Sequence, residues 1–398
     1  MLVSAMVLAT TVASRDNPTV LSNLVLPMDT NGRALITGEA DVLVHNGSFH
    51  FYFNNWGDCP GLDCCGTRGG CASCCMSHTT DCTYFDNHTV VAYRSDDLKS
   101  FTPLGVVFST GRFDALRGVA MFRPHLLYNP AFRKFVMWYK ASCFACNGTG
   151  TPNQGWYGVA TADSLAGPFR VEVDEVPGIS GGDQFLFQDT DPNGDGHAYV
   201  VVMGKVQQLN ASYTGVVPGA EVKIPRPPKP TSSGPPGGSG DNRWEAPVMF
   251  SGGVDAASGQ RRYFIIGGHN CCACKGGSNA YVMTALGSPL GAWRYVDDIG
   301  ENTTQCAMQR DPDGVCYQGG HSPLQWIDHA QTAAAFSIQE AGRNESTTVL
   351  LSNQWITAPE PLYARNADLL YWHAVRWDNT GMPQQIEWRD ELELNLAA

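Results

Sequence analysis

The chain repeats one arrangement of polar, apolar and turn-forming positions five times along its 398 residues. Each copy begins with a polar or charged residue, continues as a short apolar stretch, turns at Gly, Asn or Asp, and returns as an aromatic-rich stretch. Short apolar stretches separated by such residues are typical of β-hairpins. The five predicted hairpins join residues 39–47 to 49–53, 123–130 to 135–139, 183–187 to 198–202, 245–250 to 263–266, and 321–327 to 332–337.

A second motif follows three of these hairpins, at residues 91–101, 159–169 and 282–293. It indicates a third strand, a turn and the start of a fourth. A radially repeated unit of about four antiparallel strands is a propeller blade. We therefore predict an all-β, five-bladed β-propeller that forms a single domain over residues 15–398. A two-sheet sandwich is the alternative, but it would not show this repeated order of strands and turns.

Composition agrees with this fold and limits the partners. The 43 Gly and 24 Pro residues, with only 16% charged residues, favour many short strands joined by tight turns. The net charge of -12 argues against binding to nucleic acid, whose phosphates repel an acidic surface. No segment has the roughly 20 apolar residues of a membrane-spanning helix. We expect a monomer.

Several features indicate a secreted protein. Residues 1–14 form an apolar run that ends in small residues, as in a signal peptide; a buried first strand is the alternative. The chain has 14 cysteines, seven of them in a predicted insertion at 57–82, and six Asn-x-Ser/Thr sequons. We expect disulfide bonds in loop insertions. Zinc is the less favoured interpretation of Cys71-x-x-Cys74 and Cys143-x-x-Cys146, because no His lies nearby at ligand spacing.

Two further segments are interpreted as loops. Residues 225–242 are rich in Pro, Gly and Ser and bury little apolar surface, so we expect a flexible surface loop. The Asp189-Thr-Asp-Pro-Asn-Gly194 segment matches the first half of a calcium-binding EF-hand loop. Its twelfth position is Val200 instead of the bidentate Glu, so we interpret it as a hairpin turn.

The candidate chemistry lies where the inner strands begin. In a propeller the first strand of each blade lines the axis, and the residues at the start of these strands converge at one mouth. A solvated ring of charges is the alternative to a functional site, but five such groups are costly to bury together without a function. The five residues are Glu39, Arg123, Asp183, Glu245 and His321.

Three carboxylates around one axis fit the cleavage of glycosidic bonds. One carboxylic acid protonates the leaving oxygen, and a carboxylate on the other side activates water or attacks directly. A third carboxylate can raise the pKa of the acid through like-charge repulsion. Residues on different blades can provide the wide separation of an inverting enzyme, in which a water must fit between them.

From about Asp29 to Trp388 the chain resembles glycoside hydrolase family 43, whose five-bladed propellers cut arabinose-, xylose- or galactose-containing glycans. In this resemblance Asp183 of Asp183-Gln-Phe-Leu-Phe modulates the acid's pKa, and Glu245 of Arg243-Trp-Glu-Ala-Pro is the general acid. His321 matches an axial His that contacts a central ion or water. The resemblance thus implies a polysaccharide or oligosaccharide substrate and no required cofactor, with a structural Ca²⁺ on the axis as an option.

The second blade, Arg123-Pro-His-Leu-Leu-Tyr-Asn, is similar to that of the exo-acting galactan-cleaving branch of the family. Members of that branch usually carry Glu before Arg-Pro, where this chain has Phe122. Arg123 and His321 are candidate substrate-binding residues. Trp244, Trp138 and Tyr139 are candidates for stacking on sugar rings. For Trp138 and Tyr139 the alternative is a place in the blade core.

The general base is Glu39, by its position at the start of the first inner strand. Asp41, two residues further on the same side of the strand, is the alternative base. Family members usually have Asp, in an Asp-Pro pair, at the position where this chain has Glu39. A third alternative is therefore a site without a competent base. The sequence thus leaves three hypotheses: a glycoside hydrolase, a catalytically weak carbohydrate-binding propeller, and a structural extracellular propeller.

Overall fold

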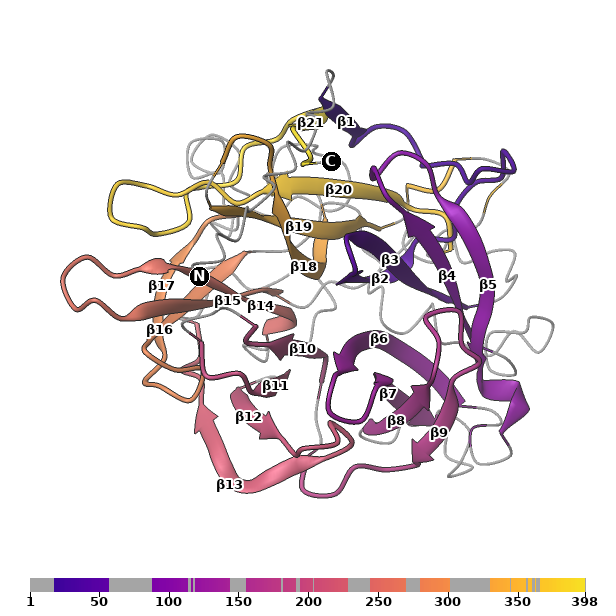
Figure 1. Ribbon diagram of the computed structural model, residues 1–398, viewed down its shortest axis with the longest axis horizontal. Helices are drawn as coiled ribbons and strands as arrows, with labels where there is room; N and C mark the ends of the chain where they lie inside the picture. Colours follow the sequence, from indigo (N-terminus) through magenta and orange to yellow (C-terminus); the bar gives the residue numbers. More distant parts are fainter. Residues whose placement is uncertain are drawn as a thin grey trace, which may run out of the picture.

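The computed structural model describes residues 18–56, 88–113, 116, 119–143, 155–179, 182–190, 194–202, 204–227, 244–269, 280–300, 330–343, 345–355, 357–359, 362 and 366–397. Its strands form five antiparallel sheets around a common axis and one two-stranded sheet near the chain ends (Figure 1). The first strand of each of the five sheets contacts the first strands of both neighbouring sheets. The predicted five-bladed β-propeller is confirmed.

The blades follow one another along the chain, and within each sheet the strands lie in sequence order from the axis outward. Blade one contains β2 (Gly38–His45), β3 (Ser48–Asn55), β4 (Thr89–Ser95) and β5 (Thr102–Ser109). Blade two contains β6 (Val119–Asn129), β7 (Lys134–Cys143), β8 (Trp156–Ala162) and β9 (Arg170–Val173). Blade three contains β10 (Gln184–Gln188), β11 (Ala198–Val202), β12 (Lys205–Leu209) and β13 (Val216–Lys223).

Blade four contains β14 (Trp244–Val254), β15 (Arg261–His269), β16 (Tyr281–Leu286) and β17 (Arg294–Asp298). Among the described residues, blade five has three strands: β18 (Gln331–Gln339), β19 (Ser346–Gln354) and β20 (Leu369–Ala374). The predicted third-strand motif is confirmed in β4, β8 and β16. The Asp-rich segment joins the paired strands β10 and β11, which confirms a hairpin connection there.

The core lies between blades, and this explains why the second strand of each blade is apolar on both faces. In β3, Phe51 packs with Trp372 of blade five, whereas its neighbour Tyr52 packs with blade two. In β7, Met137 faces blade one and Trp138 faces blade three. Successive strand residues point to opposite faces, and each face meets another sheet. A continuous apolar run is therefore required here.

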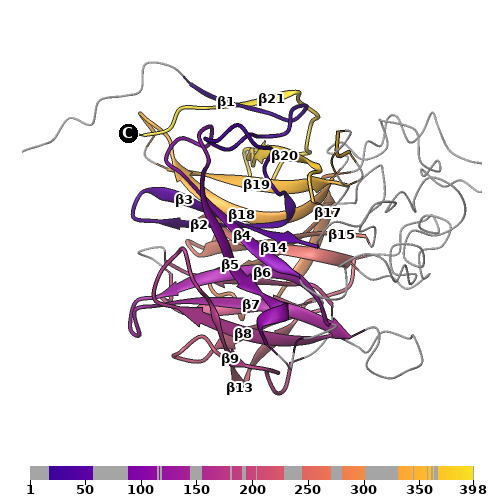
Figure 2. The same ribbon diagram turned by 90° about the vertical axis from the view of Figure 1, so that its right-hand side faces the viewer.

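The ring closes through both ends of the described chain. Strand β1 (Thr19–Ser22) pairs antiparallel with β21 (Glu391–Leu394), and both lie outside β20 (Figures 1 and 2). Asn23 continues this closure. Its side chain accepts a hydrogen bond from the Trp372 N–H (2.7 Å) and donates to the Arg389 carbonyl (2.9 Å) and the Trp372 carbonyl (3.3 Å). One fully buried amide thus joins the first residues to the last blade.

Two predictions about strand positions need correction. Residues 332–337 were predicted to be the returning second strand of blade five, but they belong to β18, its innermost strand. The predicted outgoing strand, 321–327, lies outside the described residues. In blade two, the inner strand begins at Val119 and not at Arg123. Gly118 directly precedes this start in the sequence, but the prediction placed the start at the charged residue Arg123.

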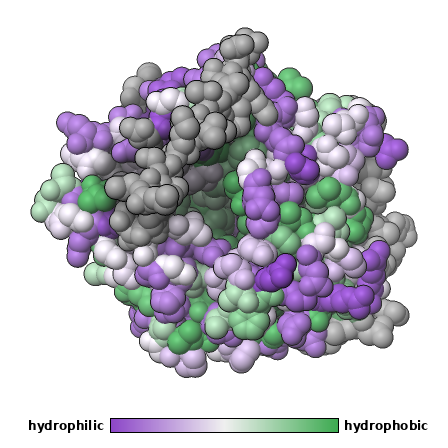
Figure 3. Space-filling view, viewed as in Figure 1, coloured by the Kyte–Doolittle hydropathy of each residue, from purple (hydrophilic) through white to green (hydrophobic). Residues whose placement is uncertain are grey.

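Other predicted segments lie wholly or mostly outside the described residues: the expected signal peptide at 1–14, the Cys-rich insertion at 57–82, and 228–242 of the Pro-rich loop. Within the part that is described, no helix has the length and apolar character needed to cross a membrane. In the space-filling view the surface is hollowed near the centre of the ring (Figure 3).

Replacing Asn23 by Ala tests the closure. We expect the free energy of unfolding to fall by about 2–4 kcal/mol, because the buried backbone groups of Trp372 and Arg389 lose their partners. Urea denaturation followed by fluorescence measures this change. Asn31→Ala is the control, since Asn31 is exposed in a turn and its loss should cost less than about 0.5 kcal/mol. Equal stabilities of the two variants would contradict this role of Asn23.

Candidate active site

Four of the five inner strands carry a β-bulge near their first residues. Each bulge places one extra residue in the inner strand, which turns side chains that would otherwise alternate regularly. At three of these positions a residue other than glycine has a positive φ: Glu39 (33°), Arg123 (53°) and Ala246 (53°). Such backbone costs roughly 1–3 kcal/mol and persists only where neighbours hold it. The register shifts lie between Gly38 and Ala40, Phe122 and His125, Glu245 and Val248, and Thr332 and Ala334.

Side chains from adjacent blades hold these strained residues. The Arg123 N–H donates to Oε2 of Glu39 (2.8 Å), and the Arg123 carbonyl accepts from Nε2 of Gln184 (2.7 Å). Blades one and three thus bind both backbone groups of Arg123, which belongs to blade two. Asp183 of blade three and Thr332 of blade five hold Ala246 in the same way. Ala246 N–H donates to Oδ2 of Asp183 (3.1 Å), and Oγ1 of Thr332 donates to the Ala246 carbonyl (2.7 Å).

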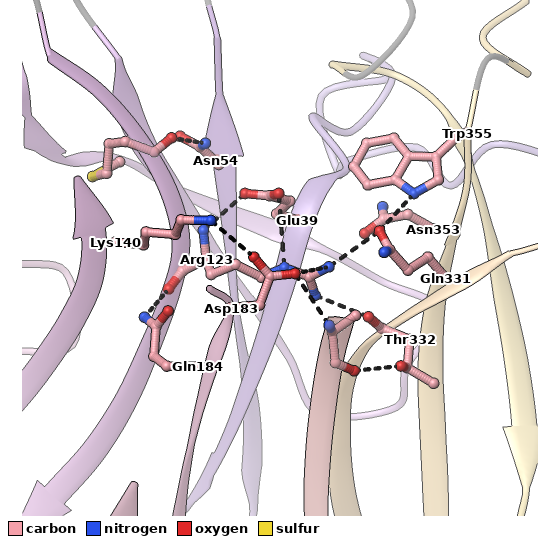
Figure 4. Close-up of polar contacts among 12 residues, drawn as sticks. Glu39, Asn54, Arg123, Lys140, Asp183, Gln184, Gln331, Thr332, Asn353 and Trp355 are labelled. Carbon is pink, nitrogen blue, oxygen red and sulfur yellow. Dashed lines mark hydrogen bonds and ion pairs between the residues drawn. The ribbon is translucent and has the colours of Figure 1, made fainter. Parts of the chain in front are cut away.

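The guanidinium of Arg123 joins four blades at the axis (Figure 4). It donates to the Thr332 carbonyl (2.9 Å) and to Oε1 of Gln331 (3.2 Å), both in blade five. It also lies 3.3 Å from Oδ2 of Asp183 and 3.7 Å from Oε1 of Glu39. Arg123 is only 2% exposed. Its charge is therefore neutralised by protein groups, and its predicted contact with substrate stays a prediction.

Asp183 is buried between two cations. Its Oδ1 lies 3.4 Å from Nζ of Lys140, and its Oδ2 contacts Arg123 and accepts the N–H of Ala246. Burial acts to raise the pKa of Asp183, but the charges of Arg123 and Lys140 and these hydrogen bonds outweigh it, so the pKa is lowered. Asp183 is therefore a fixed negative charge at neutral pH.

Glu245 is the second residue of β14, the inner strand of blade four, and the bulge that follows it contains Ala246. Burial raises the pKa of Glu245 to about 7, and the negative charge of Asp183 adds to this effect. Lys140 and Arg123 oppose the rise, and Glu39 adds a smaller upward contribution. Near neutral pH, Glu245 is thus a carboxylic acid that can release a proton, which is the property required of a general acid.

Glu39 is the third carboxyl group at the axis. Burial is the main cause of its raised pKa, with Asp183 acting in the same direction and Arg123 in the opposite one. Because Oε2 accepts the N–H of Arg123 and Glu39 is only 5% exposed, Glu39 also holds the strained backbone of blade two. The structure therefore places Glu39, Asp183 and Glu245 close enough to influence one another, and their catalytic roles stay predictions.

The alternative base, Asp41, contacts a different part of blade two. Its Oδ2 accepts the N–H of Leu126 (2.7 Å), and its Oδ1 lies 3.1 Å from Nδ1 of His125. Both oxygens of this buried carboxylate thus face β6. This geometry supports a structural role for Asp41 between the first two blades, and it favours Glu39 as the axial base candidate.

The sequence analysis missed Lys140. Its Nζ lies 5.7 Å from the centre of the Phe122 ring, in a cation–π arrangement, and 3.4 Å from Asp183. The predicted site contained only the first residues of inner strands, whereas Lys140 belongs to β7, the second strand of blade two. A lysine that directly follows the run Phe135-Val-Met-Trp-Tyr was the available signal, since all five residues of that run are buried.

Gln331 and a tryptophan pair were also missed. Trp56 and Trp355 stack with ring centres 5.8 Å apart, and Trp56 meets the edge of Phe122 at 6.2 Å. Nε1 of Trp355 donates to Oε1 of Gln331 (3.0 Å), the atom that also accepts from Arg123. These aromatic rings thus pack beside the axial charges and hold the amide of Gln331 in one orientation.

The predicted sugar-stacking residues have different outcomes. Trp138 is 0% exposed, packs between blades two and three, and donates from Nε1 to the Tyr213 carbonyl (2.7 Å). It cannot present a ring face to a sugar, so the alternative interpretation as a core residue is correct. Tyr139 is likewise buried, against Phe108. The side chain of Trp244 and all of His321 lie outside the described residues.

The axial Ca²⁺ that the resemblance allows stays a prediction; the described part of the chain contains no group of three or more His, Cys, Asp or Glu residues able to hold a metal ion. The polar groups nearest the axis are instead paired with Arg123 and Lys140. The residue that the resemblance assigned to a central ion, His321, is outside this part.

Comparison with known proteins shows that this chain is similar in fold to several solved structures. No family model and no curated protein sequence matches the chain. Among solved structures, a β-1,3-galactosidase of glycoside hydrolase family 43 superposes with a TM-score of 0.63 at 19% identity, over 94% of this chain and 64% of that protein. This chain thus spans slightly less than two thirds of that protein.

Two other structures cover nearly the whole chain. An exo-β-1,3-galactanase from Clostridium thermocellum has a TM-score of 0.63 at 16% identity, over 95% of this chain and 67% of its own. One from Phanerochaete chrysosporium, solved with β-1,3-galactotriose, has a TM-score of 0.60 at 17% identity, over 94% and 68%. The resemblance to family 43 that the sequence indicated is thus confirmed at the level of the fold.

The raised pKa of Glu245 predicts how stability depends on pH. A carboxyl group whose pKa is higher in the folded protein binds its proton more tightly there, so its contribution to stability is complete at low pH and is lost as pH rises through about 7. Between about pH 5 and pH 8, the wild type should lose on the order of 2 kcal/mol relative to Glu245→Gln, whose amide does not titrate. Urea denaturation across this range measures the difference, and a difference that does not change with pH contradicts the assignment.

Proposed function

We propose that this protein is a secreted, inverting O-glycosyl hydrolase that acts on galactose-, arabinose- or xylose-containing glycans. The observation that supports this most is the difference between two neighbouring carboxyl groups. Glu245 has a pKa of about 7, whereas Asp183 has a lowered pKa and stays ionised. A proton donor beside a fixed negative charge, with a third carboxyl group at the same axis, is the arrangement that glycosidic cleavage requires.

In the proposed reaction, Glu245 gives its proton to the glycosidic oxygen as the bond from that oxygen to the anomeric carbon breaks. Glu39 accepts a proton from a water molecule, whose oxygen bonds to the anomeric carbon from the opposite face. The products are a free hydroxyl on the leaving sugar and an inverted hemiacetal. Asp183 keeps Glu245 protonated before the reaction through its negative charge, and Arg123 keeps Asp183 ionised.

The sugar class rests on similarity of fold. The similar structures are named as β-1,3-galactosidase, exo-β-1,3-galactanase and, at a TM-score of 0.50 and 16% identity over 89% of this chain, an α-L-arabinofuranosidase from Clostridium thermocellum. Phe122 stands where galactan-cleaving members usually carry Glu, and its ring lies beneath Lys140. A Glu at this position would put another acceptor for sugar hydroxyls near Asp183. Because this chain has Phe122 there instead, arabinans and xylans should be tested as substrates beside galactans.

Secretion rests on the sequence: an apolar N-terminal run, 14 cysteines and six sequons. These features belong together in proteins that fold in an oxidising compartment. We propose that the protein acts outside the cell as a monomer, on polysaccharide or oligosaccharide.

A specific observation favours a second candidate function, a carbohydrate-binding propeller with little or no turnover. Glu39 is 5% exposed, and one of its oxygens is bound to the N–H of Arg123. A base engaged in this way can offer a water only Oε1, which itself lies 3.7 Å from the Arg123 guanidinium. Binding to glycans without release of sugar would support this alternative, whereas turnover that depends on Glu245 would exclude it.

Replacing Glu245 by Gln tests the hydrolase. We expect the release of reducing sugar from galactan, arabinan or xylan to fall by about 10²–10⁴-fold, because an amide cannot protonate the leaving oxygen. The rate of hydrolysis of an aryl glycoside of the same sugar should fall much less, because the departure of a good leaving group needs no proton. Proton NMR of the first product formed identifies its anomer, and inversion is expected.

Glu172→Gln is the matched control, since Glu172 is an exposed glutamate in β9 of blade two. It should hydrolyse both substrates like the wild type. Near-normal hydrolysis of polysaccharide by Glu245→Gln would contradict the assigned role of Glu245, and a product of retained configuration would contradict the role of Glu39.

Replacing Lys140 by Met tests the charge balance. The charge of Lys140 lowers the pKa of Glu245, so its removal should move the basic limb of the kcat/KM profile upward by roughly one pH unit. Lys134→Met, in the same strand but at its exposed end and paired with Asp163, is the control and should leave the profile unchanged. A basic limb that stays in place in Lys140→Met would show that Glu245 does not set it.

A further inference from the structure

A second cavity lies on blade five, away from the axial site. Its volume is about 350 Å³, at the lower end of the range of small-molecule sites. It lies beside the turn that joins β18 to β19. The described residues that line it are Arg343, Glu345, Ser346, Thr347, Val375 and Trp377.

This cavity is on the opposite face of the propeller from the carboxylates. Strand β18 begins at Gln331, which contacts Arg123 at the axis, and ends at Gln339, shortly before the turn. Eight residue steps along a strand span roughly 25 Å. A ligand in this cavity therefore cannot touch Glu39, Asp183 or Glu245.

Trp377 forms a rigid wall of the cavity. Its indole packs against Phe264 (ring centres 5.3 Å apart) and Phe250 (6.2 Å), both in blade four. The side chain is nevertheless partly exposed, and it lines the cavity. Blade four thus fixes the indole from behind, and part of its surface remains available to a ligand.

Arg343 is held in place at the rim. Its Nη1 lies 3.2 Å from Oε2 of Glu340, a buried carboxylate that also accepts from Oγ1 of Thr347 (2.6 Å) and from the N–H of Asn395 (3.3 Å). The Arg343 side chain is still 65% exposed, so the rest of its guanidinium faces outward. Glu345 and Ser346 are exposed beside it.

We propose that this cavity is a second, non-catalytic glycan site that binds about one or two sugar rings of a neutral polysaccharide. The apolar C–H face of a pyranose fits an indole wall, and its hydroxyl groups match the guanidinium of Arg343, the carboxylate of Glu345 and the hydroxyl of Ser346. Because Arg343 is already paired with Glu340, the exposed Glu345 leaves the rim with one net negative charge, which disfavours an anionic ligand and is compatible with a neutral one. The ligand class rests on the proposed function.

A site on the far face would increase retention on long chains without changing the chemistry. A polymer that reaches both faces would be held at two points, so its effective affinity would exceed that of either site. A trisaccharide is too short to span the roughly 25 Å between them. The proposal thus predicts an effect on polymers alone.

The test uses the Glu245→Gln protein, which should bind glycan without cutting it. Asn344→Gln is added throughout, so that no N-glycan at the Asn344-Glu345-Ser346 sequon can fill the cavity. Into this parent we introduce Trp377→Ala, Arg343→Ala or, as a control, Arg170→Ala, an exposed arginine in β9 of blade two. Electrophoresis through gels that contain galactan, arabinan or xylan measures the dissociation constants.

We expect the first two variants to bind polymer at least about five-fold more weakly than the parent, and Arg170→Ala to bind like the parent. With Glu245 restored, all of them should hydrolyse a trisaccharide at the wild-type rate. Trp377→Ala also removes packing against blade four and can therefore destabilise the protein. If it does, Arg343→Ala at the exposed rim is the variant whose result decides the test.

The outcomes separate the second site from the catalytic proposal. Unchanged binding of polymer by Arg343→Ala overturns the second site while the hydrolase stands. If Arg343→Ala binds polymer more weakly but the wild type releases no sugar, the second site is supported and the hydrolase is overturned. Equal losses of polymer binding and trisaccharide hydrolysis overturn a separate site, and no binding of any polymer by the parent overturns both.

Discussion

The structure depends on the burial of one guanidinium at the propeller axis. A charge that is 2% exposed must be matched by nearby acceptors, because an unpaired buried ion costs several kcal/mol. Arg123 meets this requirement with two carboxylates, an amide and a carbonyl from blades one, three and five. Apolar packing and other polar contacts, such as those between Asp41 and Leu126 and between Thr332 and Ala246, also join the five blades. The polar contacts of Arg123 fix how their first residues meet.

The charges at the axis give two similar residues, Asp183 and Glu245, different protonation states near neutral pH. Asp183 and Glu245 are both carboxyl groups in adjacent blades, and burial acts on both to raise the pKa. Asp183 touches two cations and accepts a backbone N–H, so its pKa falls. Glu245 is affected more by burial and by the charge of Asp183, so its pKa rises to about 7. The environment thus assigns the roles of fixed charge and proton donor.

Much of this arrangement could be predicted from the sequence, because a propeller repeats its units. The alternation of turns and apolar runs located Glu39, Asp183 and Glu245 at the start of inner strands, and the structure brings them together. Lys140 could not be found in this way, because its strand reaches the axis only through the length of its side chain. The error in blade five has a different cause: the long segment before β18 hid which strand is innermost.

The limits of pattern reading are clearest for aromatic residues. Trp138 was a candidate for sugar stacking because tryptophan is common in glycan sites, but in a propeller both faces of a second strand meet another sheet. Aromatic residues there fill the space between blades, as Phe51 and Tyr52 also do. Sequence alone cannot separate the two uses, since both require a large apolar ring in an apolar run.

Finally, the site and the closure of the ring depend on each other. Arg123 in blade two bonds to the carbonyl of Thr332 in the last blade, and Thr332 in turn bonds to Ala246 in blade four. The last blade keeps its position through β1 and β21 and through Asn23, which is bonded to Trp372. If the last blade separates, Arg123 loses two acceptors while its charge stays near the axis. The electrostatic cost of that state opposes partial opening, so the charged site contributes to the cooperativity of the fold.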